Sequence, residues 1–546
     1  MTKPADQARA TDDFDDAVDR LRADYDTTPY NSLSFPQSAP GQLAAVAYLF
    51  GLETAEVSSA RVLEIGCATG GNLIPMAAAH PRARVVGLDL SQVQIDLGRA
   101  RVQALGLDNV ELVAGDIAQM DLAALGQFDF IIAHGVYSWV PPQVQEALLS
   151  TFRRLLAPEG VAYLSYNVYP GWTSKQVIRD AMQLASGASA TPDDRAREAR
   201  GMVDFLEEVA PADGVLARVV AEFRAHSEGF EDSYLLHEEL ETFNAPCYFY
   251  EMVGRVGAHG LAYLAEARPE AMFPRNFGPK VEEYLLKKCG GVQVLVEQYI
   301  DFAVNRMFRE SLLVHAERAP QIHYHPDRSR FRRLNIAAWV PPVDGPTRLD
   351  NSRQEFEAAE GATLFTNDPG IKAALDALGA RWPWTLSRDE LVDSVHARLV
   401  SAGLTPSAGL PDVVDDLMSV LILQGQARYR LDPVVLQPAS APLRLDETAR
   451  RMVELTGSEG QASTFNLWNE TQVLSPLQRH LLPLLDGTRD RNGLVEALMA
   501  VDRENPIPIE RDGSPVSGEA ETRDALIDYL DALPQLLAEM KLLRVS

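Results

Sequence analysis

A glycine-rich turn that follows directly on an apolar strand is the feature that most limits how this chain can fold. Residues 62–72 read VLEIGCATGGN, and residues 85–89 form a second apolar run that ends in Asp89. Glycine permits a sharp turn and lets a ligand approach the backbone, while a carboxylate about twenty residues later can accept hydrogen bonds from ribose hydroxyls. The pattern therefore predicts a doubly wound α/β sheet that binds a nucleotide-type cofactor.

The small residues in this turn favour one class of cofactor. A dinucleotide fingerprint requires glycine at positions 66, 68 and 71, but Ala68 occupies the middle position. The spacing Glu64-x-Gly66-x-Ala68-x-Gly70 instead resembles the first motif of class I S-adenosylmethionine (SAM)-dependent methyltransferases. Segments that resemble the third, fourth and fifth strands of that family follow in order, at residues 110–117, 128–135 and 161–167. The resemblance implies an α/β fold with a Rossmann-like class I methyltransferase sheet, SAM as cofactor, and a methyltransferase enzyme.

Residues at the strand ends form the expected cofactor site. Asp89 is placed to bind the ribose hydroxyls. The resemblance assigns Glu64 to the amino-acid end of SAM, and Asp116 with Ile117 to the adenine. The backbone of the glycine turn is expected to lie against the methionine part. The complete set of expected cofactor-binding residues is Tyr30, Glu64, Gly66, Cys67, Ala68, Gly70, Asn72, Asp89, Leu90, Asp116, Ile117 and His134.

The acceptor side is expected after the fourth and fifth strands and beneath an N-terminal cover. Residues 134–141 read HGVYSWVP, and their histidine can act as a base, polarise an acceptor or contact the cofactor only through its backbone. The aromatic residues of this segment are expected as pocket walls. Residues 25–40 are too rich in proline and aromatics for a helix interior, so we expect a lid. The expected catalytic-side residues are His134, Tyr137, Trp139, Tyr166 and Asn167.

The methyltransferase core is expected to span residues 1–178 and to be followed by a helical insertion or regulatory region at 179–342. A class I sheet needs two more strands, and we predict them at residues 261–267 and 334–339, with helices between 281 and 314. The two predicted segments would supply strands six and seven and complete the sheet. The alternative is that the core ends near residue 178 and that 179–342 is a separate helical domain.

Two smaller units are expected in the C-terminal part of the chain, at residues 360–435 and 445–546. Each shows a series of helices followed by a short β element, at 427–431 and 542–545, so both are predicted to be winged-helix-like α+β units. Winged helices often bind DNA, but neither third helix carries the series of basic residues that contact with a groove needs. We therefore expect these units to contact protein.

Charge and cysteine content restrict the partners further. The chain has 546 residues and a formal charge of −27, which disfavours binding to phosphate backbones, so no nucleic-acid partner is expected. The same charge also serves solubility and identifies no substrate. Its three scattered cysteines lack metal-ligand spacing, and no metal is expected. Neither a signal peptide nor a long apolar stretch is present in the sequence, so we expect a cytoplasmic protein without membrane association.

Two middle segments give a more particular resemblance. Residues 236–249 and 301–309, together with residues 25–40, resemble bacterial methyltransferases with a methyltransferase regulatory domain. That group includes rickettsial-type protein lysine methyltransferases that act on outer-membrane proteins. The resemblance implies methyl transfer to a lysine amine of a protein partner. Two alternatives stay open: a small-molecule N- or O-methyltransferase whose accessory domains form a lid or the contacts of a homodimer, and a non-catalytic SAM-binding regulator.

Overall fold

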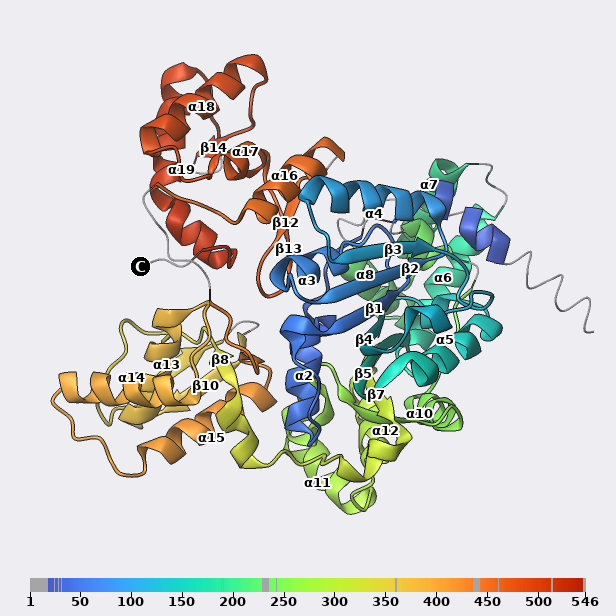
Figure 1. Cartoon of the computed structure of the whole chain (residues 1–546), viewed down its shortest axis with the longest axis horizontal. Helices are drawn as coiled ribbons and strands as arrows, with labels where there is room; N and C mark the ends of the chain where they lie inside the picture. Colours follow the sequence, from blue (N-terminus) through green and yellow to red (C-terminus); the bar gives the residue numbers. More distant parts are fainter. Residues whose placement is uncertain are drawn as a thin grey trace, which may run out of the picture.

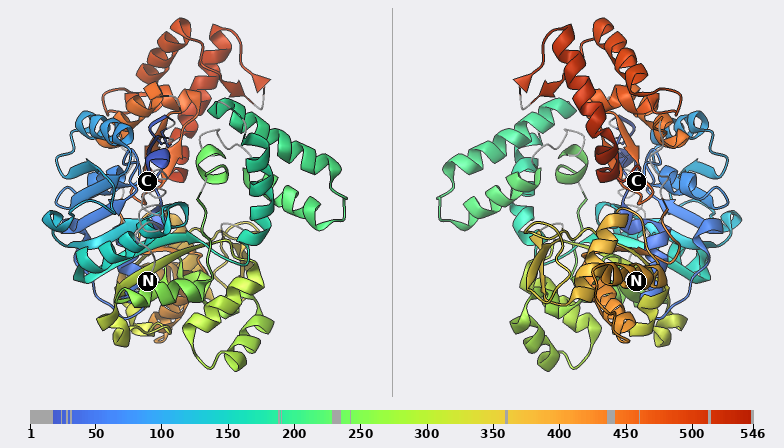
Figure 2. Two further views of the ribbon diagram at one scale, coloured as in Figure 1. Left: turned by 90° about the vertical axis from the view of Figure 1, so that its right-hand side faces the viewer. Right: turned by 90° about the vertical axis from the view of Figure 1, so that its left-hand side faces the viewer.

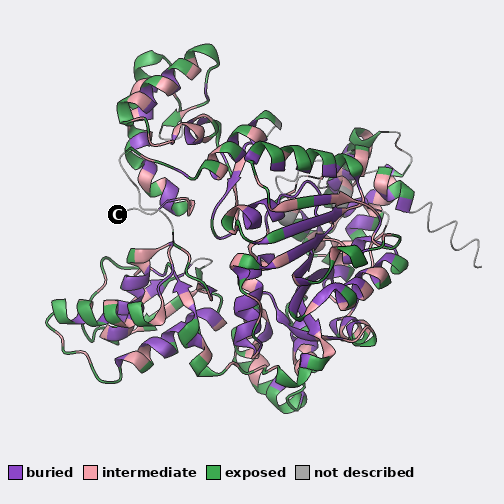
Figure 3. Ribbon diagram, viewed as in Figure 1, coloured by how far each residue is buried: buried purple, intermediate pink, exposed green. Residues whose placement is uncertain are grey.

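A computed structural model describes residues 18–543 apart from residues 24, 28, 31, 188, 190, 228–234, 242, 359–360, 436–441, 460 and 512–513. A central sheet with helices on both faces forms the largest part, and two smaller units lie beside it (Figure 1). The strands of the sheet are mostly buried, whereas the helices around it expose their outer faces (Figure 3). None of the helices in the described ranges is long and apolar enough to cross a membrane.

Seven strands form the central sheet in the order β3-β2-β1-β4-β5-β7-β6. The first five are parallel, and β7 runs antiparallel to both β5 and β6. This order, with one antiparallel strand next to an edge, is that of a class I methyltransferase sheet, so the predicted fold class is confirmed. The strands are β1 (Arg61–Ile65), β2 (Arg84–Asp89), β3 (Val110–Ala114), β4 (Phe128–Ala133), β5 (Leu156–Asn167), β6 (Leu261–Glu266) and β7 (Phe308–His315).

Local signals explain the helices between the strands. Ser91 caps α4 by accepting a hydrogen bond from the backbone of Gln94, and Gly106 ends that helix with a φ of 71°. A separate group of three helices projects from the sheet (Figure 2) and packs around a small core of its own. The core helices are α2 (Pro40–Leu49), α3 (Leu73–Ala79), α4 (Gln92–Leu105), α5 (Pro142–Leu155), α10 (Phe249–Ala258), α11 (Pro279–Lys288) and α12 (Gln293–Val304); the projecting ones are α6 (Trp172–Ser186), α7 (Pro192–Val209) and α8 (Val215–Ser227).

The last strand of the sheet corrects one prediction. Residues 261–267 were expected as a strand and contain β6, but the seventh strand is β7 and not 334–339. The helices expected up to residue 314 end at Val304. Within 334–339, β8 (Asn335–Ala337) pairs instead with β11 (Arg428–Arg430) in a two-stranded sheet. The prediction was wrong because the second and third residues of β7 are the charged Arg309 and Glu310, which interrupt the apolar pattern typical of a buried strand.

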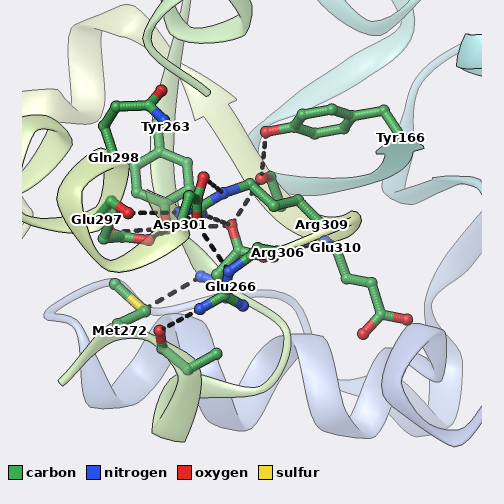
Figure 4. Close-up of polar contacts among 12 residues, drawn as sticks. Tyr166, Tyr263, Glu266, Met272, Glu297, Gln298, Asp301, Arg306, Arg309 and Glu310 are labelled. Carbon is green, nitrogen blue, oxygen red and sulfur yellow. Dashed lines mark hydrogen bonds and ion pairs between the residues drawn. The ribbon is translucent and has the colours of Figure 1, made fainter. Parts of the chain in front are cut away.

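Both charges are buried, and Arg309 is part of an ion cluster that attaches β7 to β6 and α12 (Figure 4). The Arg309 guanidinium lies among three buried carboxylates and 3.7 Å from the centroid of the Phe249 ring. Because each carboxylate accepts from the guanidinium, the cost of burying the charges is offset only while the set is complete. The bonds run from Nη1 to Glu266 Oε1 (2.8 Å) and Glu297 Oε2 (2.9 Å), and from Nη2 to Asp301 Oδ1 (2.8 Å).

Two further units follow the core. The first contains the hairpin β9 (Gln354–Glu357) and β10 (Thr363–Thr366) and the helices α13 (Pro369–Arg381), α14 (Arg388–Ser401) and α15 (Leu410–Leu423). The final strand expected at 542–545 is absent at 542–543, and residues 544–545 lie outside the described part. The second unit contains α16 (Glu447–Glu459), β12 (Ser463–Phe465), β13 (Thr471–Val473), α17 (Pro476–Leu481), α18 (Arg491–Glu504), β14 (Glu510–Arg511), β15 (Ser514–Pro515) and α19 (Glu519–Glu539).

Removing Arg309, the cation that contacts all three carboxylates, should destabilise the core strongly. We expect Arg309→Met to lower the free energy of unfolding by about 3–5 kcal/mol, because three buried carboxylates lose their shared partner. Urea titration measures the loss, and hydrogen exchange of the β7 amides localises it. Arg523→Met, which removes an exposed ion pair with Glu496, is the control and should unfold close to wild type. An Arg309→Met protein as stable as this control would contradict the assigned role.

Candidate active site

A cavity of about 450 Å³ lies at the carboxyl ends of the parallel strands. Its volume is typical of a small-molecule site. The structure brings thirteen of the sequence-predicted residues to its wall, and they come from the strand ends, the glycine turn and the N-terminal segment. These residues are Tyr30, Glu64, Gly66, Cys67, Ala68, Asn72, Asp89, Leu90, Asp116, Ile117, His134, Trp139 and Asn167.

Three predicted residues are not among those that line the cavity. Gly70 turns the backbone with a φ of 81°. Tyr137 was expected as a pocket wall, but the tight turn Tyr137–Trp139 directs it into the core, where its ring meets that of Tyr166 edge to face at 6.4 Å. Their hydroxyls contact Arg255 (3.4 Å) and Ser311 (2.9 Å), respectively. Of the aromatic residues in this turn, only Trp139 reaches the cavity.

The glycine turn is shaped by close contacts on both sides. Gly66 has a φ of 76°, and a Cβ atom there would lie 2.4 Å from the Val136 side chain. Ala68 has a φ of 47°, and its N–H donates to Asp89 Oδ2 at 2.8 Å. The other oxygen of Asp89 accepts from the Ser91 N–H at 2.9 Å. Burial raises the pKa of Asp89. The acid of β2 is thus held by the turn that follows β1, and its predicted contact with ribose stays a prediction.

Two buried carboxylates in the cavity wall each have one oxygen without a hydrogen-bond donor from the described residues. Glu64 Oε1 accepts from Asn72 Nδ2 at 2.8 Å, and Asp116 Oδ1 accepts from the Ala118 N–H at 2.8 Å. Glu64 Oε2 and Asp116 Oδ2 are the atoms left over. Buried acceptors without donors are costly, so a ligand with N–H groups at two separated points would stabilise this wall. SAM carries an α-ammonium and an adenine amino group, and the wall fits it in this respect.

The N-terminal segment covers the cavity. Ser32 Oγ accepts from the Gly71 N–H at 2.9 Å, and a Cβ at Gly71 would lie 2.1 Å from the Ser32 carbonyl oxygen. Only glycine allows the two backbones this close. The Phe35 N–H donates to Asn72 Oδ1 at 2.9 Å, and the Phe35 ring stacks on His134 with 3.7 Å between centroids. The predicted lid therefore lies against the cavity, although its residues 28 and 31 are outside the described part.

The tautomer of His134 follows from the hydrogen bonds behind it. Arg268 Nε donates to Glu310 Oε2 at 2.9 Å, so the Glu310 carboxylate is an acceptor. The Tyr163 hydroxyl donates its single hydrogen to Glu310 Oε1 at 3.1 Å. The Tyr163 oxygen therefore accepts from His134 Nδ1, which lies 2.8 Å away. Burial and the nearby Arg268 lower the pKa of His134 to about 3. The ring is therefore neutral, with its proton on Nδ1 and a lone pair on Nε2.

Lys175 is a cavity residue that the sequence analysis missed. Its Nζ lies 2.7 Å from Glu239 Oε1 and 4.6 Å from the centroid of the Trp172 ring, and both Lys175 and Trp172 line the cavity. Trp172 in turn meets Trp139 edge to face at 5.9 Å. A single lysine in the first turn of a helix carries no signal by itself. The sequence feature that could have indicated Lys175 is its spacing of three residues from Trp172, which places both side chains on the same face of the helix.

Three features together define a class I SAM-dependent methyltransferase. They are the strand order, the hydrogen bond between the glycine turn and the acid of β2, and the two buried carboxylates that each have one oxygen without a donor from the described residues. Family models agree, and they match a methyltransferase domain at residues 62–160, a predicted methyltransferase regulatory domain at 231–315 and a PKMT C-terminal winged helix domain at 448–542. The last match confirms the winged-helix prediction for the second C-terminal unit.

Comparison with whole proteins places the chain in a family. It is 31% identical over 514 residues to the uncharacterized protein RP789 of Rickettsia prowazekii, covering 92% of this chain and 90% of that protein. The chain belongs to the same methyltransferase family as RP789. A second protein of that organism, RP028, is 34% identical over 230 residues, which are 42% of this chain and 92% of RP028. The solved structure of PKMT2 from Rickettsia typhi in complex with AdoHcy has a TM-score of 0.83 and 26% identity, covering 94% of this chain and 99% of that one.

The substitution Glu64→Gln should have opposite effects on stability and on cofactor affinity. Burial, only partly offset by Asn72, raises its pKa from 4.5 to about 8. Since the folded-state pKa lies above the unfolded one, Glu64 costs stability increasingly as the pH rises from 4.5 to 8. We expect Glu64→Gln to be more stable than wild type by about 2–4 kcal/mol at pH 8 and equal to it near pH 4.5.

The same variant should bind SAM about tenfold or more weakly, because the α-ammonium loses a charged acceptor. Denaturant titrations at several pH values and calorimetry with SAM measure the two effects. Glu111→Gln, an exposed acid on β3, should change neither. A Glu64→Gln protein that binds SAM as tightly as wild type would contradict the role of this carboxylate.

The tautomer of His134 can be tested directly. Tyr163→Phe removes the acceptor of the Nδ1–H, so we expect the proton to move to Nε2 in part or completely. Nitrogen-15 NMR of histidine-labelled protein distinguishes the tautomers, and a His134→Gln sample assigns the signal. Tyr324→Phe, which removes a half-buried hydroxyl that donates to the Tyr263 carbonyl at 3.0 Å, is the control. An unchanged His134 signal in Tyr163→Phe would refute the hydrogen-bond chain.

Proposed function

We propose that this enzyme transfers the methyl group of SAM to the side-chain amine of lysine in a protein. The observation that best supports this proposal is the setting of a lysine in the cavity wall: Lys175 lies over the Trp172 ring and beside the Glu239 carboxylate. An aromatic face with a nearby acid attracts a lysine head group and accommodates its methylated forms. The solved structure quoted above is of a protein whose name, PKMT2, denotes a lysine methyltransferase, which supports the same acceptor.

The residues of the site would hold SAM at both ends. Glu64 would accept from its α-ammonium, Asp89 from its ribose hydroxyls and Asp116 from its adenine amino group. SAM supplies an electrophilic methyl group, and the amine nitrogen forms the new bond as the carbon–sulfur bond breaks. Because the reaction needs little covalent chemistry from the protein, alignment of the amine and exclusion of water account for much of the acceleration.

The acceptor amine must be neutral before it can attack. With SAM bound, the positive charge of its sulfonium and the exclusion of water by Trp139, Trp172 and Phe308 would lower the pKa of the acceptor amine, so that it releases its proton to solvent. A histidine with a pKa of about 3 is a weak base, so His134 would orient the amine by accepting one of its N–H groups at Nε2. Of the three roles considered from the sequence, this arrangement supports polarisation of the acceptor.

The acceptor can be identified by mass spectrometry. Incubation with SAM should add methyl groups to lysines of unstructured lysine-containing peptides and release an equal amount of S-adenosylhomocysteine. The same peptides with every lysine acetylated should yield neither product. Asp89→Ala enzyme is the control for cofactor-dependent turnover. Release of S-adenosylhomocysteine with small amines or alcohols, but with no lysine peptide or protein, would overturn the proposed acceptor class.

A further inference from the structure

The loop between β12 and β13 extends from the second C-terminal unit to the cofactor site. Asn469 in this loop donates through Nδ2 to Asn72 Oδ1 at 3.2 Å, across 397 positions of sequence. Asn72 lies directly before α3, lines the cavity and holds Glu64. The β12–β13 hairpin accordingly lies beside α3 (Figure 1), while β12 also bonds to α16 of its own unit through Thr464 Oγ1, which donates to the Ala449 carbonyl at 2.8 Å. A residue of the winged-helix part is thus separated from a cavity carboxylate by one side chain.

All the hydrogen-bonding capacity of the Asn72 amide is used. Its oxygen accepts from the Phe35 N–H (2.9 Å) and from Asn469 Nδ2, and its nitrogen donates to Ser38 Oγ (3.0 Å) and Glu64 Oε1 (2.8 Å). These four partners fix which end of the amide faces Glu64. In the opposite orientation an amide oxygen would face a carboxylate. Asn469 therefore helps to hold the Glu64 carboxyl group in place, with its second oxygen free for a ligand.

The same hairpin also holds the N-terminal cover. The Ser34 N–H donates to Thr471 Oγ1 at 2.9 Å, and the Ser34 hydroxyl lies 2.8 Å from the same atom. The neighbouring residues Leu33 and Phe35 line the cavity. Asn469 and Thr471 thus reach the floor and the cover of one site. Because one short hairpin makes both contacts, a chance approach of this unit to the cofactor site does not explain them well.

The loop is closed by its own hydrogen bonds and is tied to both C-terminal units. Asn466 accepts through Oδ1 from the N–H groups of Trp468 (2.9 Å) and Glu470 (3.2 Å), which closes the loop. Trp468 is fully buried, and its Nε1 donates to the Pro383 carbonyl of the first unit at 3.1 Å. Glu470 pairs with Lys541 of the second unit at 2.7 Å. A displacement of either unit would therefore move Asn469.

We propose that the C-terminal units complete the cofactor site through this loop and set its affinity for SAM. Asn469 is a positioning residue that acts on Glu64 through Asn72, and Thr471 positions the cover. Any partner that shifts the winged-helix units changes SAM affinity by the same route. The proposal goes beyond the acceptor assignment, and SAM binding can be measured without an acceptor.

Calorimetry with SAM on the full chain tests the proposal. Asn469 has a φ of 60°, so Asn469→Gly keeps the backbone conformation and removes only the amide. We expect this variant and Thr471→Val each to bind SAM about three- to tenfold more weakly. Val473→Ala, an exposed position on the same hairpin, is the matched control and should bind like wild type. Thermal unfolding of each variant verifies that it is folded.

A double-mutant cycle separates positioning from a merely structural role. If Asn469 acts through Asn72, Asn469→Gly should have no further effect on SAM affinity in an Asn72→Ala background. A structural role would lower the affinity by the same factor in both backgrounds, and this result would overturn the proposal. Wild-type affinity in both Asn469→Gly and Thr471→Val would overturn it as well.

Discussion

Two consecutive buried charges on β7 support both the core and the active site. Successive side chains of a strand point to opposite faces of the sheet. Arg309 accordingly neutralises the carboxylates of β6 and α12, while Glu310 points away from that cluster (Figure 4) and accepts from Tyr163 and Arg268. Because Tyr163 orients His134, the tautomer at the cavity depends on a strand that is stable only while its buried charges are paired.

The parts of the fold that were predictable from sequence are those with local signals. The glycine turn, the acid of β2 and the first five strands each show their pattern within a few residues, and most of the expected cofactor residues lie together at the cavity. β7 was misplaced because its second and third residues, Arg309 and Glu310, are charged, and their charged partners lie 8 to 43 positions away. The contact between Asn469 and Asn72 joins segments 397 positions apart, so no spacing rule could have shown it, and the spacing of Lys175 from Trp172 does not indicate its partner Glu239.

The cavity is built at some cost to stability. Glu64 and Asp116 each keep one buried oxygen without a donor from the described residues, and burial raises the pKa of Glu64 to about 8. Such groups destabilise a folded chain, and a protein selected only for stability would have replaced or paired them. Their persistence beside a glycine turn that leaves room for a ligand is best explained by binding, because a ligand with two N–H ends recovers the lost hydrogen bonds.

The position of the two C-terminal units gives this binding a further consequence. If a protein acceptor contacts those units and shifts them, the loop at Asn469 alters the Asn72 amide and hence the Glu64 carboxyl group. Linkage then requires the reverse effect: SAM bound at Glu64 must favour one placement of the units, with the same coupling free energy. An enzyme arranged in this way would bind its acceptor better when the methyl donor is present, and the two C-terminal units would take part in catalysis without contributing a catalytic side chain.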